Sequence, residues 1–136
     1  MRPPSGALWL TRLVILTIAA TWAWAALNKL IAIRDAGSAT TLPEWLRSSW
    51  VWGPAVAVEI LVASLLASGS ERAGLVLGLC LLAAYSSVLV LVPNASACGC
   101  GLDLGADPLA RNAFLGSLHV LGFALICGLR TDEAQD

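Results

Sequence analysis

The stretch that decides the fold is residues 73–92, AGLVLGLCLLAAYSSVLVLV, which contains no charged side chain. Its length matches the roughly 20 residues that an α-helix needs to cross the hydrocarbon core of a bilayer. Pro93 follows directly and ends the predicted helix, because proline lacks the N–H that a helix requires and its ring clashes with the preceding turn. We therefore expect a membrane-spanning helix over about residues 73–92.

Three further apolar segments have the same character and cover about residues 8–33, 51–68 and 109–129. Backbone polar groups must be satisfied internally in hydrocarbon, so each segment is expected to be helical. Asp107 is suited to cap the last helix, with Pro108 in its first turn. The sequence predicts an all-α, integral membrane four-helix bundle that forms a single domain over residues 1–136.

The composition supports this class of protein. The chain is 58% hydrophobic and only 12% charged, with a mean hydropathy of +0.80. A soluble core of this size could not bury so much apolar surface, so the lipid bilayer is the expected environment. The formal net charge of −1 provides no basic field for nucleic acid, which we exclude as a partner.

The N-terminus admits a second interpretation. Arg2, the apolar run after it and the stretch AWAAL at residues 23–27 together resemble a signal peptide with its cleavage site. The apolar pattern continues through Leu30 and Ile31, beyond a cleavage point near Ala25, so we favour a retained first helix. Lysine and arginine divide equally between the two sides of a four-helix bundle, and charge alone therefore does not orient it.

Two of the four cysteines lie inside predicted helices. Cys80 lies about 13 residues before Pro93, roughly 20 Å down the helix axis, and Cys127 falls near the far end of the last helix. Neither is expected to reach the polar link between the last two helices. We predict that both are inert packing residues, and that the four cysteines do not form one metal site.

Cys98 and Cys100 lie in that polar link, residues 93–108, PNASACGCGLDLGADP. Gly99 gives the backbone freedom to bring the two cysteines within disulfide distance. A disulfide across so tight a ring should be strained and readily exchanged, which favours a thiol–disulfide exchange pair. A metal or metallochaperone site and two incidental small residues in a turn are the alternatives. We predict no metal site, because the neighbouring carboxylates match zinc poorly.

Ionisable side chains inside the predicted spans form the second candidate site. Glu59 lies within the second span, and an intramembrane carboxylate usually finds a partner. We expect it to approach Lys29 near the end of the first helix, or Arg111 at the start of the last. A structural ion pair and a proton or quinone site are both open at this stage.

His119 is the only histidine of the chain. One histidine without clustered ligands is a poor metal site, so a hydrogen-bonded packing role is expected, with proton relay as the alternative. Tyr85, Ser86 and Ser87 are the predicted partners, because hydroxylated residues link membrane helices.

Three stretches resemble the methylamine utilisation protein MauE family, within the broader DoxX-like membrane proteins. CGCGLDLG with ARNAFLG is similar to that family's cysteine–glycine–cysteine and arginine–asparagine signature before the last helix. AALNKLIAIRDAG resembles its Lys-Leu at the end of the first helix, and PAVAVEILVASLLASG resembles its second helix. The resemblance covers about residues 20–126.

The resemblance implies a multi-pass protein of the bacterial inner membrane with both termini cytoplasmic and the Cys98–Cys100 loop periplasmic. It implies a thioredoxin-like periplasmic partner and a role in the disulfide formation or maturation of an exported protein. It does not by itself assign methylamine metabolism, because DoxX-like relatives serve other pathways. Whether the chain is itself an oxidoreductase stays open: the alternatives are a non-catalytic accessory or scaffold subunit and a quinone-linked oxidoreductase subunit. No cofactor is assigned beyond the quinone alternative.

Overall fold

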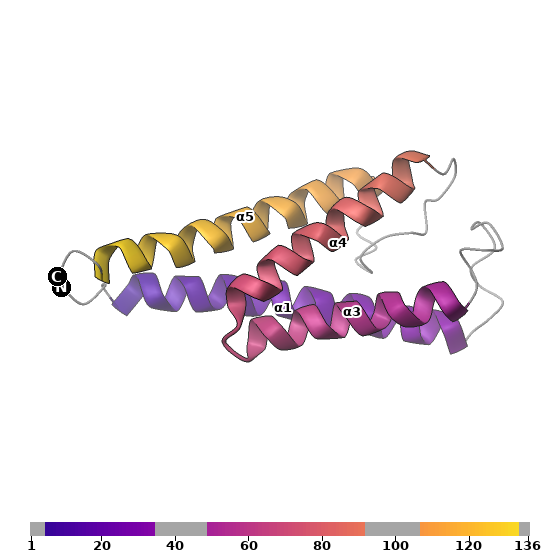
Figure 1. Ribbon diagram of the computed structural model, residues 1–136, viewed down its shortest axis with the longest axis horizontal. Coiled ribbons are helices and arrows are strands. Elements are labelled where there is room, and N and C mark those ends of the chain that lie inside the picture. The colour runs from indigo at the N-terminus through magenta and orange to yellow at the C-terminus, as the bar shows by residue number, and fades with distance from the viewer. Residues whose placement is uncertain (1–4, 35–48, 92–106, 134–136) are drawn as a thin grey trace.

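The protein is a bundle of four long helices (Figure 1). The structure, a computed structural model, describes residues 5–34, 49–91 and 107–133. Every regular element within these ranges is a helix, and each overlaps one of the predicted segments, which confirms the all-α membrane bundle. The helices are α1 (Ser5–Arg34), α3 (Ser49–Ala67), α4 (Glu71–Leu91) and α5 (Pro108–Glu133).

The helices pack as a ring in which α1 contacts α3 and α5, and α4 contacts the same two neighbours. The start of α1 and the end of α5 lie together at one end of the bundle (Figure 1). The opposite end, which we call the distal end, is defined by the helix termini Arg34, Ser49, Leu91 and Pro108. The ends of α4 and α5 that flank Cys98 and Cys100 therefore both lie at the distal end.

A tight turn joins α3 to α4. The Ser68 N–H still donates to the Ser64 carbonyl at 2.9 Å, and Gly69 then adopts φ 90°, a left-handed conformation that glycine tolerates best. The link is short, because α3 ends at Ala67 and α4 already begins at Glu71. The two helices approach closely beyond the turn, where a Cβ added at Gly74 would lie 2.8 Å from Leu66 Cγ.

The predicted start of the last helix is confirmed. Asp107 Oδ1 accepts a hydrogen bond of 3.1 Å from the Leu109 N–H, and the Asp107 carbonyl accepts one of 3.0 Å from the Arg111 N–H. This satisfies one of the N–H groups that a helix N-terminus leaves without a partner. Pro108 occupies the first helical position, where its missing N–H costs nothing.

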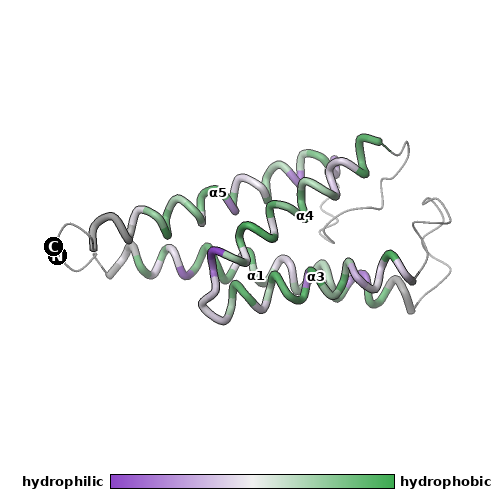
Figure 2. Tube along the Cα trace, in the orientation of Figure 1, coloured by the Kyte–Doolittle hydropathy of each residue, from purple (hydrophilic) through white to green (hydrophobic). Residues whose placement is uncertain are grey.

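The distribution of polarity is that of a membrane protein. Large apolar side chains such as Leu16, Leu61, Val76 and Val120 are exposed on the outer surface, and apolar residues cover all four helices in Figure 2. Each helix contains a stretch long and apolar enough to cross a bilayer. The protein is therefore a multi-pass membrane protein. These spans are Leu8–Ile31, Trp50–Ala67, Glu71–Leu91 and Pro108–Gly128.

Candidate functional site

The predicted exchange pair, Cys98 and Cys100, belongs to residues 92–106 and lies outside the described residues. The other two cysteines are described and carry free thiols. Cys80 is exposed on the outer surface of α4, and Cys127 is half-buried on α5. The part of the candidate site that the structure describes is therefore the set of buried polar side chains between the helices.

Lys29, Glu59 and Tyr85 form the centre of this set, and we call them the buried triad. Lys29 Nζ lies 2.5 Å from Glu59 Oε1, and the Tyr85 hydroxyl donates to the same oxygen at 2.6 Å. The Glu59 side chain is 0% exposed and that of Lys29 is 10% exposed. One carboxylate oxygen thus joins three helices, α1, α3 and α4.

The triad places a formal ion pair in the bundle interior, where unpaired charge is costly. Lys29 Nζ also lies 5.0 Å from the centre of the Tyr85 ring, so the aromatic face adds a second attraction for the cation. Glu59 Oε2 differs from Oε1, because it is buried and has no hydrogen-bond partner among the described residues. Within the described residues, hydrogen bonds therefore reach only one oxygen of the carboxylate.

Of the two partners predicted for Glu59, the structure shows Lys29. Arg111 is half-buried on the first turn of α5 and makes interactions of its own. Its neighbour Asn112 is buried and donates from Nδ2 to the Ser86 hydroxyl at 3.2 Å, which links α5 to α4. Asn112 was not among the predicted site residues.

His119 lies in a second polar layer, with Trp22 as its partner. Trp22 Nε1 donates to His119 Nε2 at 3.0 Å, and the rings meet edge to face with their centres 5.9 Å apart. An indole N–H can only donate, so Nε2 accepts and the hydrogen lies on Nδ1, which donates to the Leu115 carbonyl at 2.8 Å. The ring is therefore neutral, with both nitrogens satisfied.

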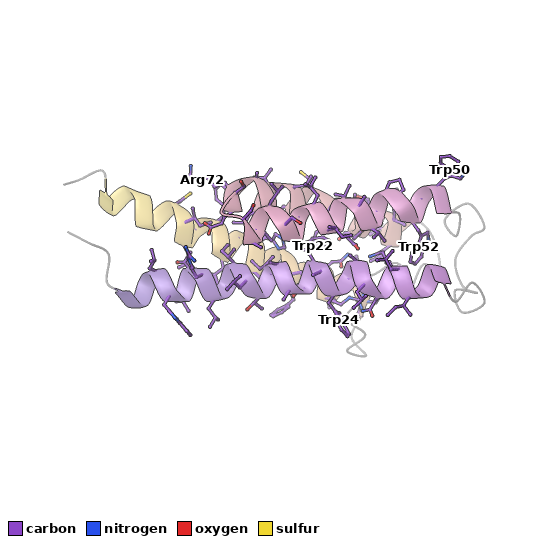
Figure 3. All side chains as sticks on the ribbon, turned by 90° about the horizontal axis from the view of Figure 1, so that it is seen from below. Trp22, Trp24, Trp50, Trp52 and Arg72 are labelled. Carbon is purple, nitrogen blue, oxygen red and sulfur yellow. The ribbon has the colours of Figure 1, made fainter. Side chains whose placement is uncertain are left out.

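The prediction that Tyr85, Ser86 and Ser87 serve as partners of His119 was wrong. Tyr85 donates to Glu59, Ser86 accepts from Asn112, and Ser87 donates back to the Ala83 carbonyl of its own helix. Trp22 points into the bundle in Figure 3, whereas Trp24 points away from it. The predicted packing role of His119 agrees with its two hydrogen bonds.

Gly78 allows α4 to approach the Trp22–His119 pair. A Cβ added there would lie 2.9 Å from His119 Cδ2 and 3.2 Å from Trp22 Nε1. A methyl group at this position would therefore displace the imidazole or the indole. The sequence contains a signal for this close approach, since Gly74 and Gly78 are four residues apart on one face of α4, as at small-residue helix contacts in membranes.

Both polar layers can be located relative to the distal end. Lys29 lies roughly 8 Å along the axis from Arg34, and Tyr85 roughly 9 Å from Leu91, at about 1.5 Å per residue. Glu59 is near the middle of α3, but side chains tilt toward the N-terminus of their helix, which for α3 is the distal end. His119 lies deeper, roughly 17 Å from Pro108.

Two hollows on the described surface differ in polarity. A groove of about 610 Å³ between α1 and α3 is lined mainly by alanine and leucine, and a smaller hollow of about 200 Å³ near the α3–α4 turn includes Arg12 and Glu71. Within the described ranges, no group of three or more His, Cys, Asp or Glu side chains is arranged to hold a metal ion.

Comparison with known proteins gives one match. The family model of methylamine utilisation protein MauE matches residues 7–127, nearly the whole chain. No curated protein and no solved structure matches. The matched range contains the buried triad, His119 and both cysteines of the polar link.

Proposed function

The chain belongs to the MauE family of methylamine utilisation proteins, and on that basis we propose that it is a membrane thiol–disulfide exchange component. Cys98 and Cys100 cycle between dithiol and disulfide. The exchange partner is a thioredoxin-like protein of the periplasm, and the pair serves to form the disulfides of an exported protein.

The observation that carries this proposal is the pair Cys98–Gly99–Cys100 in the segment between α4 and α5 of a MauE-family chain. The two described cysteines lie within helices, apart from the distal end, so they do not compete for this role. A thiolate of the reduced partner attacks the Cys98–Cys100 disulfide and forms a mixed disulfide while one cysteine of the pair leaves as a thiolate. The partner's second thiol then displaces the other cysteine, so that two electrons and two protons pass from the partner to the pair; the exchange is reversible, and the same steps run backwards when the pair is reduced.

The proposed location is the bacterial inner membrane, with both termini in the cytoplasm and the Cys98–Cys100 segment in the periplasm. The even number of described spans supports termini on one side. The oxidising periplasm supports a persistent disulfide at the opposite face. Reaction of Cys98 and Cys100 with a membrane-impermeant maleimide added to intact cells, after outer-membrane permeabilisation, tests this orientation.

Trapping of the mixed disulfide tests the exchange itself. Cys98→Ser and Cys100→Ser each leave one thiol that can form a mixed disulfide with the partner. If the removed cysteine is the one that would resolve this mixed disulfide, the adduct persists. We expect one single variant to accumulate a covalent adduct with a periplasmic protein, visible on non-reducing gels and lost on reduction.

The matched controls are Cys80→Ser and Cys127→Ser, which change thiols within helices. They should leave the adduct of the trapping variant unchanged. An adduct in neither the Cys98 nor the Cys100 variant would contradict the exchange role and favour a non-catalytic accessory subunit. Purification with a bound quinone that oxidises the dithiol would favour the quinone-linked alternative.

A further inference from the structure

We propose that the protein binds one phospholipid with a zwitterionic, amine-bearing headgroup, of the phosphatidylethanolamine class, in the two hollows between α1, α3 and the start of α4. This site lies apart from the buried polar layers and does not depend on the role of the cysteines. Its basis is the continuity of a polar hollow, which contains one arginine and one glutamate, with an apolar groove that matches an acyl chain in length.

The polar hollow lies at the level of the bilayer surface. It has a volume of about 200 Å³, and both Arg12 and Glu71 line it. The apolar span of α3 ends at Ala67 and that of α4 begins at Glu71, with the polar turn serine–glycine–serine, residues 68–70, between them. Two spans that end at one level mark the boundary of the hydrocarbon core, where lipid headgroups begin. The hollow is therefore at the depth of a headgroup.

The two charged side chains of the hollow are available to a ligand. Among the described residues, the side chains of Arg12 and Glu71 form no ion pair or hydrogen bond, either with each other or with a third residue. A guanidinium presents a planar fork of donors that matches the oxygens of a phosphate, and a carboxylate accepts hydrogen bonds from an ammonium. A headgroup that carries one phosphate and one primary ammonium satisfies both side chains, whereas a purely anionic headgroup meets repulsion from Glu71.

The apolar groove continues from the polar hollow into the membrane. Leu16 and Ala67 line both, so the groove of about 610 Å³ begins where the polar hollow ends. Its lining residues extend along α1 from Leu16 to Leu30, roughly 21 Å, and along α3 from Ala67 back to Ile60, roughly 10 Å, at 1.5 Å per residue. One leaflet contributes roughly 15 Å of hydrocarbon, half the thickness of the bilayer core. The groove therefore matches one acyl chain of a lipid whose headgroup occupies the hollow.

The charges distinguish this lipid from other apolar occupants of the groove. A quinone carries no charge, so its head would satisfy neither Arg12 nor Glu71. A transmembrane helix of a second copy, packed into the groove, would account for the small alanine side chains that line it but not for the two opposite charges at its end. A zwitterionic phospholipid accounts for the polar hollow, the groove and the connection between them.

The test is native mass spectrometry of the full-length protein released from nanodiscs that contain equal amounts of phosphatidylethanolamine, phosphatidylcholine and phosphatidylglycerol. We expect one phosphatidylethanolamine to be retained per chain, with a preference of at least about tenfold over phosphatidylcholine. The quaternary ammonium of phosphatidylcholine has no N–H to donate to Glu71, and one hydrogen bond to a charged group is worth about that factor. This comparison uses the native protein and depends on no variant.

Three substitutions assign the headgroup contacts. Arg12→Gln should lower the retention of phosphatidylethanolamine by about tenfold or more, because it removes the phosphate ligand. Glu71→Gln should abolish the preference for phosphatidylethanolamine over phosphatidylglycerol, whose headgroup has no ammonium. Arg72→Gln is the matched control, because Arg72 is exposed on the same turn of α4 and does not line the hollow, and it should leave retention unchanged.

Filling the groove tests the site of the acyl chain. Ala20 lines the groove and is exposed, so Ala20→Phe should displace the bound lipid without disturbing the buried core. Ala84→Phe makes the same change at an exposed position of α4 outside the groove and should retain the lipid. Equal retention of phosphatidylethanolamine and phosphatidylcholine by the native protein would overturn the inference. So would native retention in Arg12→Gln, a quinone in place of the phospholipid, or a lipid-free dimer.

Discussion

Substitution of Gly78 by alanine tests the deeper polar layer most sharply. The new Cβ would press on the His119 imidazole and lie 3.2 Å from Trp22 Nε1, so one ring must move and their hydrogen bond is lost. Two buried polar atoms without partners cost about 1–3 kcal/mol, and overpacking a close contact costs about 1–3 kcal/mol. The better helix propensity of alanine returns about 0.5–1 kcal/mol. We expect a net destabilisation of about 1–5 kcal/mol.

Reversible unfolding of the full chain in mixed micelles, followed by tryptophan fluorescence, measures this loss. Gly116→Ala is the matched control, because a Cβ there meets no atom within 4 Å and should slightly stabilise the protein. In a His119→Ala background the Gly78→Ala substitution should cost much less, since the atoms that it displaces are gone. Equal stability of the Gly78→Ala and Gly116→Ala proteins would refute the close approach of α4 to the imidazole.

Three further substitutions probe the buried triad and the start of α5 by the same unfolding measurement. Lys29→Met should lower the free energy of unfolding by about 3–5 kcal/mol, because it leaves the buried carboxylate of Glu59 without its cation. Adding Glu59→Gln should restore most of this loss, and equal losses in the single and double variants would contradict the ion pair. Tyr85→Phe removes one hydrogen bond to a charged group and should cost about 1.5–3 kcal/mol; no loss would mean that the hydroxyl does not hold Oε1. Asp107→Ala removes the helix cap and should cost about 1 kcal/mol, whereas Ser87→Ala, whose hydroxyl bonds only its own helix, should have little effect.

Features that depend on local sequence could be predicted here. The apolar runs set the four helices, because only a helix satisfies its backbone in hydrocarbon. Asp107 and Pro108 marked the start of α5, since capping involves only neighbouring residues. The partner of Glu59 could be narrowed to Lys29 or Arg111, because a buried carboxylate requires a cation and few cations were available at that depth.

Features that depend on how each helix is rotated could not be predicted. In a soluble protein, polar residues mark the outer face of a helix, and the opposite face can be assigned to the core. Here leucine and valine occupy the outer face as well, so this distinction is lost. The face of α4 that meets α5 was therefore not apparent, and Tyr85 was assigned to His119 although it turns to Glu59. No polar pattern in the sequence distinguished Trp22, which points into the bundle, from Trp24, which points away from it.

The central claim is that Cys98 and Cys100 form a working dithiol–disulfide pair. Its most direct test is the oxidation state of these two cysteines in native membranes, measured by acid quenching, thiol alkylation and mass spectrometry. The account predicts a mixture of dithiol and Cys98–Cys100 disulfide that shifts toward disulfide when an oxidised thioredoxin-like protein is added. Two thiols that stay fully reduced under that treatment, while the partner keeps its disulfide, would contradict it.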